Sequence, residues 1–176
     1  MSFMDCLDDP LHRQMYAYWQ SKRGRRRMPR RSDIDPTEIP RLLPNILISE
    51  SVSFGGRERC RYRLAGTAIV RAFGKDPTGH YLDEITNGAY RDFIEGIHRM
   101  VRVERRPLFC ESEYTGLRGL HMVAKRLLLP VSEDEVTVKQ IFSVLVFRFG
   151  PAPAAVIELD HTEGTTRHAA PVLAEI

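Results

Sequence analysis

The sequence has few of the features that mark secreted, membrane-spanning or metal-binding proteins. Its three cysteines, Cys6, Cys60 and Cys110, lack the spacing of a zinc site or of a disulfide framework, so a reducing cytoplasm is the expected compartment. The N-terminal residues do not combine a basic segment with an apolar core, so we expect no signal peptide. No apolar run approaches the ~20 residues that span a bilayer, so we expect no membrane insertion.

The patterns that accompany catalysis are also missing from the sequence. It has no glycine-rich phosphate-binding loop, no Ser-His-Asp set around a nucleophile elbow, and no kinase or cyclase signature. Glu111 and Glu113 alternate along a predicted strand, which is more typical of a solvated face than of an acid–base pair. We therefore expect a protein that is not an enzyme and that has no metal site.

The composition that remains is that of a soluble globular protein. The 176 residues are 43% hydrophobic and 28% charged, with a net charge of +3. This length predicts one domain with extensions. We divide the chain into an N-terminal helix and basic linker over residues 1–31, a main domain over residues 32–149, and a tail over residues 150–176.

The N-terminal segment predicts an amphipathic helix. Asp9 and Pro10 form a typical helix start, and the helix is expected to run to about Lys22. Leu11, Met15, Tyr18 and Trp19 then fall on one stripe of this helix. The stripe docks either on its own domain or on a second chain, and the second alternative predicts a homodimer through Leu11–Lys22.

The segment Lys22–Arg31, which reads KRGRRRMPRR, is dense in arginine. Clustered basic residues can contact phosphates, so a nucleic-acid-associated protein is one interpretation. The segment lacks interleaved aromatic residues and is interrupted by Gly24 and Pro29. These features favour a solvated connector whose arginines pair with nearby acidic residues.

The stretch Arg61–Ile85 combines several short elements. A strand ends at Gly66, Thr67 is expected to cap a helix that reaches Phe73, and Gly74 ends that helix. A turn over residues 76–79 and a brief helix over residues 82–85 follow. Short elements of this kind indicate a pocket wall rather than a long framework element.

The order of the predicted elements indicates an α+β fold. A hairpin turning at Gly55-Gly56 precedes this stretch, and the longest helical pattern, Tyr90–Val103, follows it. Three strand-like segments come next, over residues 108–115, 120–130 and 136–149. We predict a five-stranded antiparallel sheet with helices packed on one face, plus the N-terminal helix.

Several motifs together resemble one known family. They are YW at residues 18–19, DIDP at 33–36, LP at 43–44, RYRLAGT at 61–67, GKDPTGHYLDE at 74–84 and KRLLLPVSED at 125–134. This combination resembles the single-domain PAS family of alphaproteobacteria labelled PAS_5, over about Leu11–Arg148. The resemblance implies a PAS-like fold and a sensory or interaction role, and it transfers no catalytic residue to this chain.

A ligand of such a domain would lie between the sheet and the helix at residues 90–103. Pockets of this kind are mostly apolar, with a few orienting polar groups. The residues that we expect to line it are Phe73, Tyr81, Phe93, Ile97, His98, Val101, Met122, Ala124, Val144 and Val146. The same residues could equally fill a solid core, since close packing is the default of a protein interior.

Two cofactors can be weighed against these residues. His98 lies beside the apolar stripe of the long helix, where some PAS domains carry a haem ligand, but a single histidine is a weak signal for haem. No cysteine lies in the short-helix region where light-sensing relatives attach flavin. The sequence thus disfavours haem and covalent flavin.

The combined interpretation is a cytoplasmic sensory module that regulates by binding. It would hold a small apolar or amphipathic molecule, dock on a signalling protein such as a histidine kinase, or do both. The nucleic-acid interpretation through residues 22–31 is the alternative.

Overall fold

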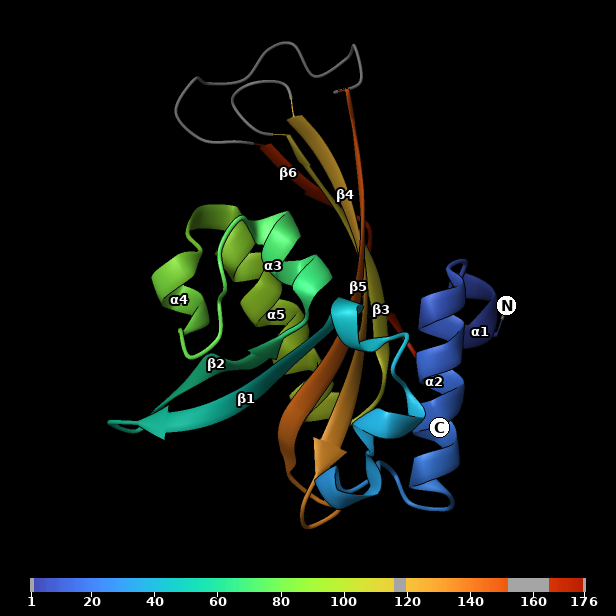
Figure 1. Ribbon diagram of the computed structural model, residues 1–176. Helices are drawn as coiled ribbons and strands as arrows, with labels where there is room; N and C mark the ends of the chain where they lie inside the picture. Colours follow the sequence, from blue (N-terminus) through green and yellow to red (C-terminus); the bar gives the residue numbers. More distant parts are fainter. Residues whose placement is uncertain (1, 116–119, 152–164, 176) are drawn as a thin grey trace.

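An antiparallel sheet forms the centre of the protein in the computed structural model, which describes residues 2–115, 120–151 and 165–175 (Figure 1). The strand order is β2-β1-β5-β4-β3-β6, and β7 also pairs with β3. The strands are β1 (Ile46–Phe54), β2 (Arg57–Ala65), β3 (Leu108–Thr115), β4 (Leu120–Ser132), β5 (Val138–Pro151), β6 (Thr165–His168) and β7 (Val172–Leu173).

The five predicted strands are confirmed, and the sheet is larger than predicted. The additional strands β6 and β7 come from the tail and pair antiparallel with β3. They have only four and two residues, which is too short for an alternating pattern to stand out in the sequence. The tail therefore covers one edge of the sheet.

Three helices cover one face of the sheet (Figure 1). They are α3 (Thr67–Phe73), α4 (Leu82–Ile85) and α5 (Gly88–Glu104). Helix α5 buries Phe93, Ile94, Ile97, His98 and Val101, which recur at intervals of one, three or four residues. It packs on β4 and β5 and therefore covers the central strands.

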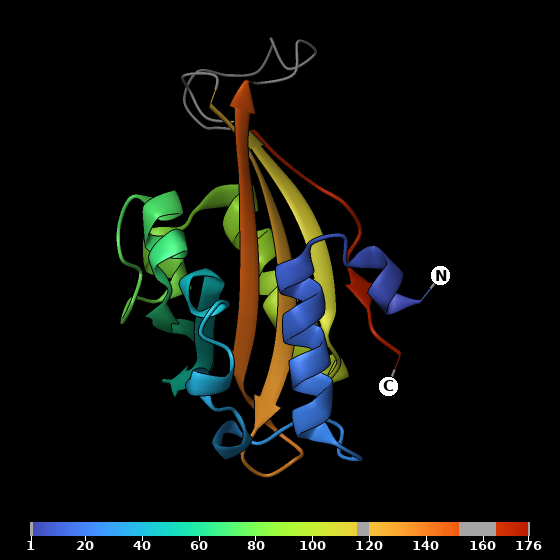
Figure 2. The ribbon, with the colours of Figure 1, turned by 45° about the vertical axis from the view of Figure 1, so that its right-hand side comes forward.

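The helices α1 (Phe3–Cys6) and α2 (Pro10–Arg23) lie across the opposite face (Figures 1 and 2). Trp19 is fully buried, and its indole N–H donates to the carbonyl of Pro130 over 2.9 Å. Met15 and Tyr16 are buried as well, and Leu11 and Tyr18 pack against the core. The aromatic stripe thus docks on its own domain, and this packing removes the basis for a homodimer through Leu11–Lys22.

The arginine-rich segment connects α2 to three short 3-10 helices, η1 (Arg31–Asp33), η2 (Pro36–Glu38) and η3 (Leu43–Asn45). Three of its seven basic side chains pair with acidic residues, as the connector interpretation predicts. Lys22 lies 2.6 Å from Glu38, Arg26 lies 2.7 Å from Asp33, and Arg30 lies 2.8 Å from Glu135. These contacts give no support to the nucleic-acid interpretation.

Gly66 explains why the RYRLAGT motif ends in glycine followed by a helix start. A Cβ atom at this position would lie 2.2 Å from the carbonyl oxygen of Leu43, so only glycine lets β2 pass this close to η3. Gly66 itself is the N-cap of α3, and Thr67 is the first helical residue without a side-chain capping bond. The prediction that Thr67 caps this helix is therefore wrong, while the predicted end at Gly74 is confirmed by its φ of 73°.

Candidate functional site

A cleft of about 280 Å³ opens at the edge of the layer between the sheet and the helices. Its walls are mostly aromatic and apolar, with three polar side chains at the opening. The lining residues are Tyr62 from β2, Phe73 and Lys75 from the end of α3, Ile85, Thr86, Asn87 and Tyr90 from the α4–α5 region, and Met122 from β4. The cleft has the apolar walls and sparse polar groups that suit a small amphipathic molecule.

A smaller cavity of about 20 Å³ lies deeper, directly under α5. A space of this size holds about one water molecule. Tyr62, Phe73 and Tyr90 line both the cavity and the cleft, so these three aromatic side chains separate the two spaces. Arg126 and His98 contribute the nitrogen-bearing side chains of the cavity lining.

Arg126 is a buried cation at this cavity, with 3% of its surface exposed. Its guanidinium donates to Ser112 Oγ over 2.6 Å, to the Ala124 carbonyl over 3.0 Å and to Tyr90 Oη over 3.1 Å. All three acceptors are neutral. Within residues 2–115, 120–151 and 165–175, no acidic side chain forms an ion pair with it.

His98 lies on α5 beside the same cavity and is 4% exposed. Its Nδ1 donates to the carbonyl of Ile94 over 2.8 Å, which leaves Nε2 with a lone pair. Nε2 is buried and has no hydrogen-bond partner among the described residues. Burial lowers the pKa of His98 to about 4, with smaller contributions from Arg102 and Arg126, so the imidazole is neutral near pH 7.

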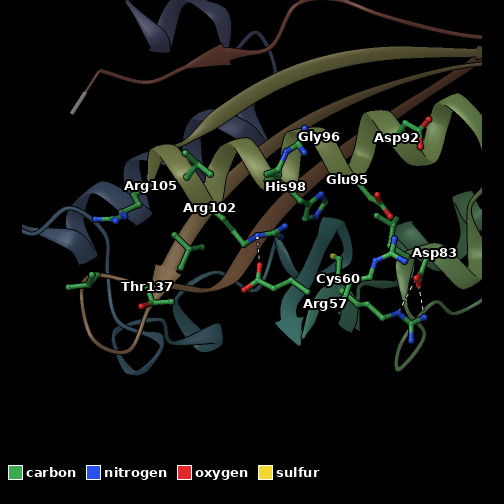
Figure 3. Close-up of a pocket in the computed structure, with 17 residues that line it drawn as sticks. Arg57, Cys60, Asp83, Asp92, Glu95, Gly96, His98, Arg102, Arg105 and Thr137 are labelled. Carbon is green, nitrogen blue, oxygen red and sulfur yellow. Dashed lines mark hydrogen bonds and ion pairs between the residues drawn. The ribbon is translucent and has the colours of Figure 1, made fainter. Parts of the chain in front are cut away.

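A third hollow, the outer groove, runs along the other side of α5 and has a volume of about 690 Å³ (Figure 3). It lies between α5, β2, α4 and the turn that joins β4 to β5. Its lining includes five arginines, Arg57, Arg59, Arg99, Arg102 and Arg105, and four acids, Glu58, Asp83, Asp92 and Glu95. The charges of the groove therefore nearly balance.

Ion pairs connect several of these groove residues, as the dashed lines in Figure 3 indicate. The guanidinium of Arg59 contacts both carboxylate oxygens of Asp83, at 2.9 and 2.7 Å, and lowers the pKa of that carboxyl. Arg102 lies 3.8 Å from Glu58. The groove is a polar surface in which Arg59 and Arg102 already have acidic partners.

Eight of the ten predicted ligand residues lie in α3, α4–α5 or on the sheet face beneath them. Phe73 and Met122 line the cleft, and Phe73 and His98 line the deeper cavity. Phe93, Ile97, Val101 and Ala124 are buried in the packed core. Tyr81 lies at the N-cap of α4, where the guanidinium of Arg59 stacks 3.8 Å from its ring centre.

Val144 and Val146 lie on the opposite face, so their predicted placement under α5 is wrong. Val146 pairs with Lys125 and Val144 pairs with Leu127 in the ladder between β4 and β5. Lys125 reaches Asp8 near α2, which fixes this set of residues on the α2 side. Ser143 and Leu145, one position away on β5, line the cavity instead.

Arg126 was missed because a charged residue within KRLLLPVSED suggests solvent. A signal did exist: Arg126 lies two residues from Ala124 and from Leu128, so strand alternation places it on the same apolar face. Tyr62 and Tyr90 also line both spaces and were not among the predicted residues. The strand period of RYRLAGT and the helical period of α5 are the signals that could have found them.

The cysteines and other candidate cofactor ligands are buried or dispersed. Burial raises the pKa of Cys60 and of Cys110 to about 11, so both are unreactive thiols near pH 7. The cavity beside His98 has the volume of about one water molecule. Over the described part of the chain, no three His, Cys, Asp or Glu side chains form a group that could hold a metal ion.

The chain has an α+β fold in which helices cover one face of an antiparallel sheet, with a cleft at the edge of that layer. Residues 7–146 match the PAS domain family PAS_5, and the chain belongs to this family. The match begins before α2, so the family includes the N-terminal helix as well as the sheet and α3–α5. The search of curated proteins and the search of solved structures found no match. None of the helices in the described residues is long and apolar enough to cross a membrane.

Proposed function

We propose that this protein is a sensory module that binds a small amphipathic ligand in the cleft and regulates a signalling protein, such as a histidine kinase, according to its occupancy. Membership of the PAS domain family supports the sensory role. The observation that carries the ligand half is the cleft itself. Its volume of about 280 Å³ lies near the lower end of the range for small-molecule sites.

The chemistry of the cleft suits a molecule with an apolar body and a polar end. Tyr62, Phe73 and Met122 offer apolar surface, and burying such surface is the main source of affinity for a small ligand. Lys75 and Asn87 are exposed at the opening, so this end of the cleft stays in contact with water. Tyr90 supplies a hydroxyl at the inner end of the cleft, where it can contact the polar end of the ligand and fix its orientation.

The position of the cleft suggests how occupancy could reach a partner. Ile85, Thr86 and Asn87 belong to the short segment between α4 and α5, and Tyr90 lies in the first turn of α5. A ligand that contacts this segment favours the conformation that binds it better, which is the requirement for a ligand-driven response. The segment between α4 and α5 is thus our candidate for the element that changes.

We also propose that the module works without catalysis and in the cytoplasm. Cys6, Cys60 and Cys110 are free thiols, which suits a reducing compartment. The family consists mostly of sensory modules, which supports a binding role rather than a chemical one.

A variant that fills the cleft tests the ligand proposal. Met122→Trp adds volume inside the cleft, and Val172→Trp adds the same side chain on β7, away from it. A library of small amphipathic compounds is screened against the wild type by ¹H–¹⁵N NMR, and hits are titrated into both variants. We expect hits that shift residues 85–90 and lose at least about ten-fold in affinity with Met122→Trp only. Hits that bind both variants equally, or no hits at all, would overturn the proposal.

A further inference from the structure

Arg126 is buried and has no acidic partner among the described residues. Moving a guanidinium out of water costs several kcal/mol unless an opposite charge and hydrogen bonds compensate it. The structure supplies three neutral acceptors and, in the described residues, no carboxylate. The interior therefore contains a buried positive charge that the hydrogen bonds of the described residues compensate only in part.

The surroundings of Arg126 add a second and independent observation. His98 lines the same cavity, and its buried Nε2 has no partner among the described residues. Arg126, which has no counterion in the described part of the chain, and His98 thus line one space large enough for a single water or a single ligand oxygen, and His98 also lines the outer groove. A close-packed apolar core would satisfy or exclude such groups.

The cavity adjoins the cleft through Tyr62, Phe73 and Tyr90. Tyr90 faces both ways: it lines the cleft, and its hydroxyl accepts from Arg126 over 3.1 Å. A ligand oxygen that enters from the cleft can take the place of this hydroxyl. Loss of the bond between Tyr90 and Arg126 would then free the first turn of α5 from β4.

We propose that the ligand is an apolar monocarboxylate whose carboxylate pairs with Arg126 while its apolar part fills the cleft. This inference rests on the proposed function and names the ligand class of the same site. A carboxylate is favoured over a larger anion because the interior space is small: one of its oxygens fits that space, and the other takes the place of the Tyr90 hydroxyl on the planar guanidinium. The displaced hydroxyl of Tyr90 connects binding to α5.

Octanoate and octan-1-ol form the matched probe pair, since they share the same apolar chain and differ in the charged end. Both are titrated into the full-length protein by NMR, and Kd values are compared. We expect the wild type to prefer octanoate by about ten-fold or more, as a buried charge-assisted bond would give. Arg126→Met should remove this preference while octan-1-ol still binds. Equal binding of the two probes to the wild type, or no octanoate binding up to its solubility limit, would overturn the inference.

Two further variants separate the contribution of Arg126 from those of Lys75 and Tyr90. Lys75→Met removes the exposed cation at the opening of the cleft, and we expect it to keep the octanoate preference. Tyr90→Phe removes the hydroxyl that competes for Arg126, so octanoate should bind at least as tightly as in the wild type. Loss of the preference in Lys75→Met, or weaker octanoate binding in Tyr90→Phe, contradicts the proposed pairing, and neither variant removes a buried cation.

The outcomes also distinguish the inference from the function on which it rests. If octan-1-ol and octanoate bind the cleft equally and Met122→Trp blocks both, the cleft is a ligand site and only the carboxylate assignment falls. If neither probe binds and the compound library gives no cleft ligand, the proposed function falls with it.

Discussion

The charged side chains on the two sides of α5 differ in how they are compensated. The outer groove contains five arginines and four acids, and its pairs lie at the surface, where water and salt reach them. The interior cavity contains one arginine, surrounded by neutral acceptors. The groove has far more charged groups, yet the single charge of the interior is the buried one that lacks a counterion among the described residues.

This contrast shows that the number of charged residues is a poor guide to a binding site. Paired charges at a surface contribute little, because the Coulomb attraction is weakened by water. A buried charge without a counterion is costly and therefore needs a reason. In this protein we infer that the reason is a ligand, and three measurements test the contrast between the groove and the cavity.

The largest effect is expected from His98, because its pKa lies far below the ordinary value. The folded protein holds the pKa near 4, whereas the unfolded chain has the ordinary value of 6.5. The unfolded state therefore binds more protons between these values, so stability falls as the pH drops from 6.5 to 4 and levels off below. Over this window we expect a loss of about 3 kcal/mol from His98 alone.

Chemical denaturation of the wild type and of His98→Leu at several pH values measures this contribution. The leucine variant should keep a smaller slope, which comes from His12, whose pKa is also lowered by burial, and near pH 4 from ion-paired carboxyls such as Asp83. The charged and titratable neighbours of His98, namely Arg102 and Arg126, together with Cys60, Tyr62 and Tyr90 around the same spaces, are unchanged in the variant. An identical slope in both proteins would mean that water reaches Nε2 from the groove, and the distinction between the two sides of α5 would be lost.

A smaller effect is expected when Arg126 is replaced in the absence of ligand. Arg126→Met removes a buried cation and keeps a side chain of similar length, so we expect the unliganded protein to gain about 1 kcal/mol, or roughly 2–4 °C in Tm. The wild type should recover this difference when octanoate is added, because a ligand stabilises the state that binds it. A loss of more than about 2 kcal/mol in the variant would show that the charge is already compensated within the protein.

The sequence predicted the architecture well because local signals and the family motifs agree. The Asp9-Pro10 helix start, the Gly55-Gly56 turn and the five long strands all appear where the pattern places them. The sequence could not predict that α2 docks on its own sheet, because an amphipathic stripe does not identify its partner. It could not predict the strands of the tail either, because they are too short to show a pattern. Packing decided both.

The interior site was predicted less completely, and the reason is the period of the strand. Alternation places residues of one strand on opposite faces, but a strand that is apolar on both faces gives no sign of which set faces α5. The prediction therefore named Val144 and Val146, whereas Ser143 and Leu145 line the cavity. Arg126 interrupts the apolar pattern of β4, and its alternation with Ala124 and Leu128 could have shown which residues of the strand face α5.

The smallest effect is expected in the outer groove. Asp83→Asn removes the negative partner of Arg59 and keeps the shape of the side chain, and Asp92→Asn serves as a control because the carboxylate of Asp92 lies 3.8 Å from Arg91 and is 73% exposed. We expect Asp83→Asn to lower Tm by no more than about 2 °C at low salt and the control to change it less. In about 1 M salt, where screening acts over roughly 3 Å, the difference from the wild type should vanish. A large loss that persists in high salt would place the Arg59–Asp83 pair in a buried environment like that of Arg126, and the groove would then have to be regarded as a second region of built-in charge.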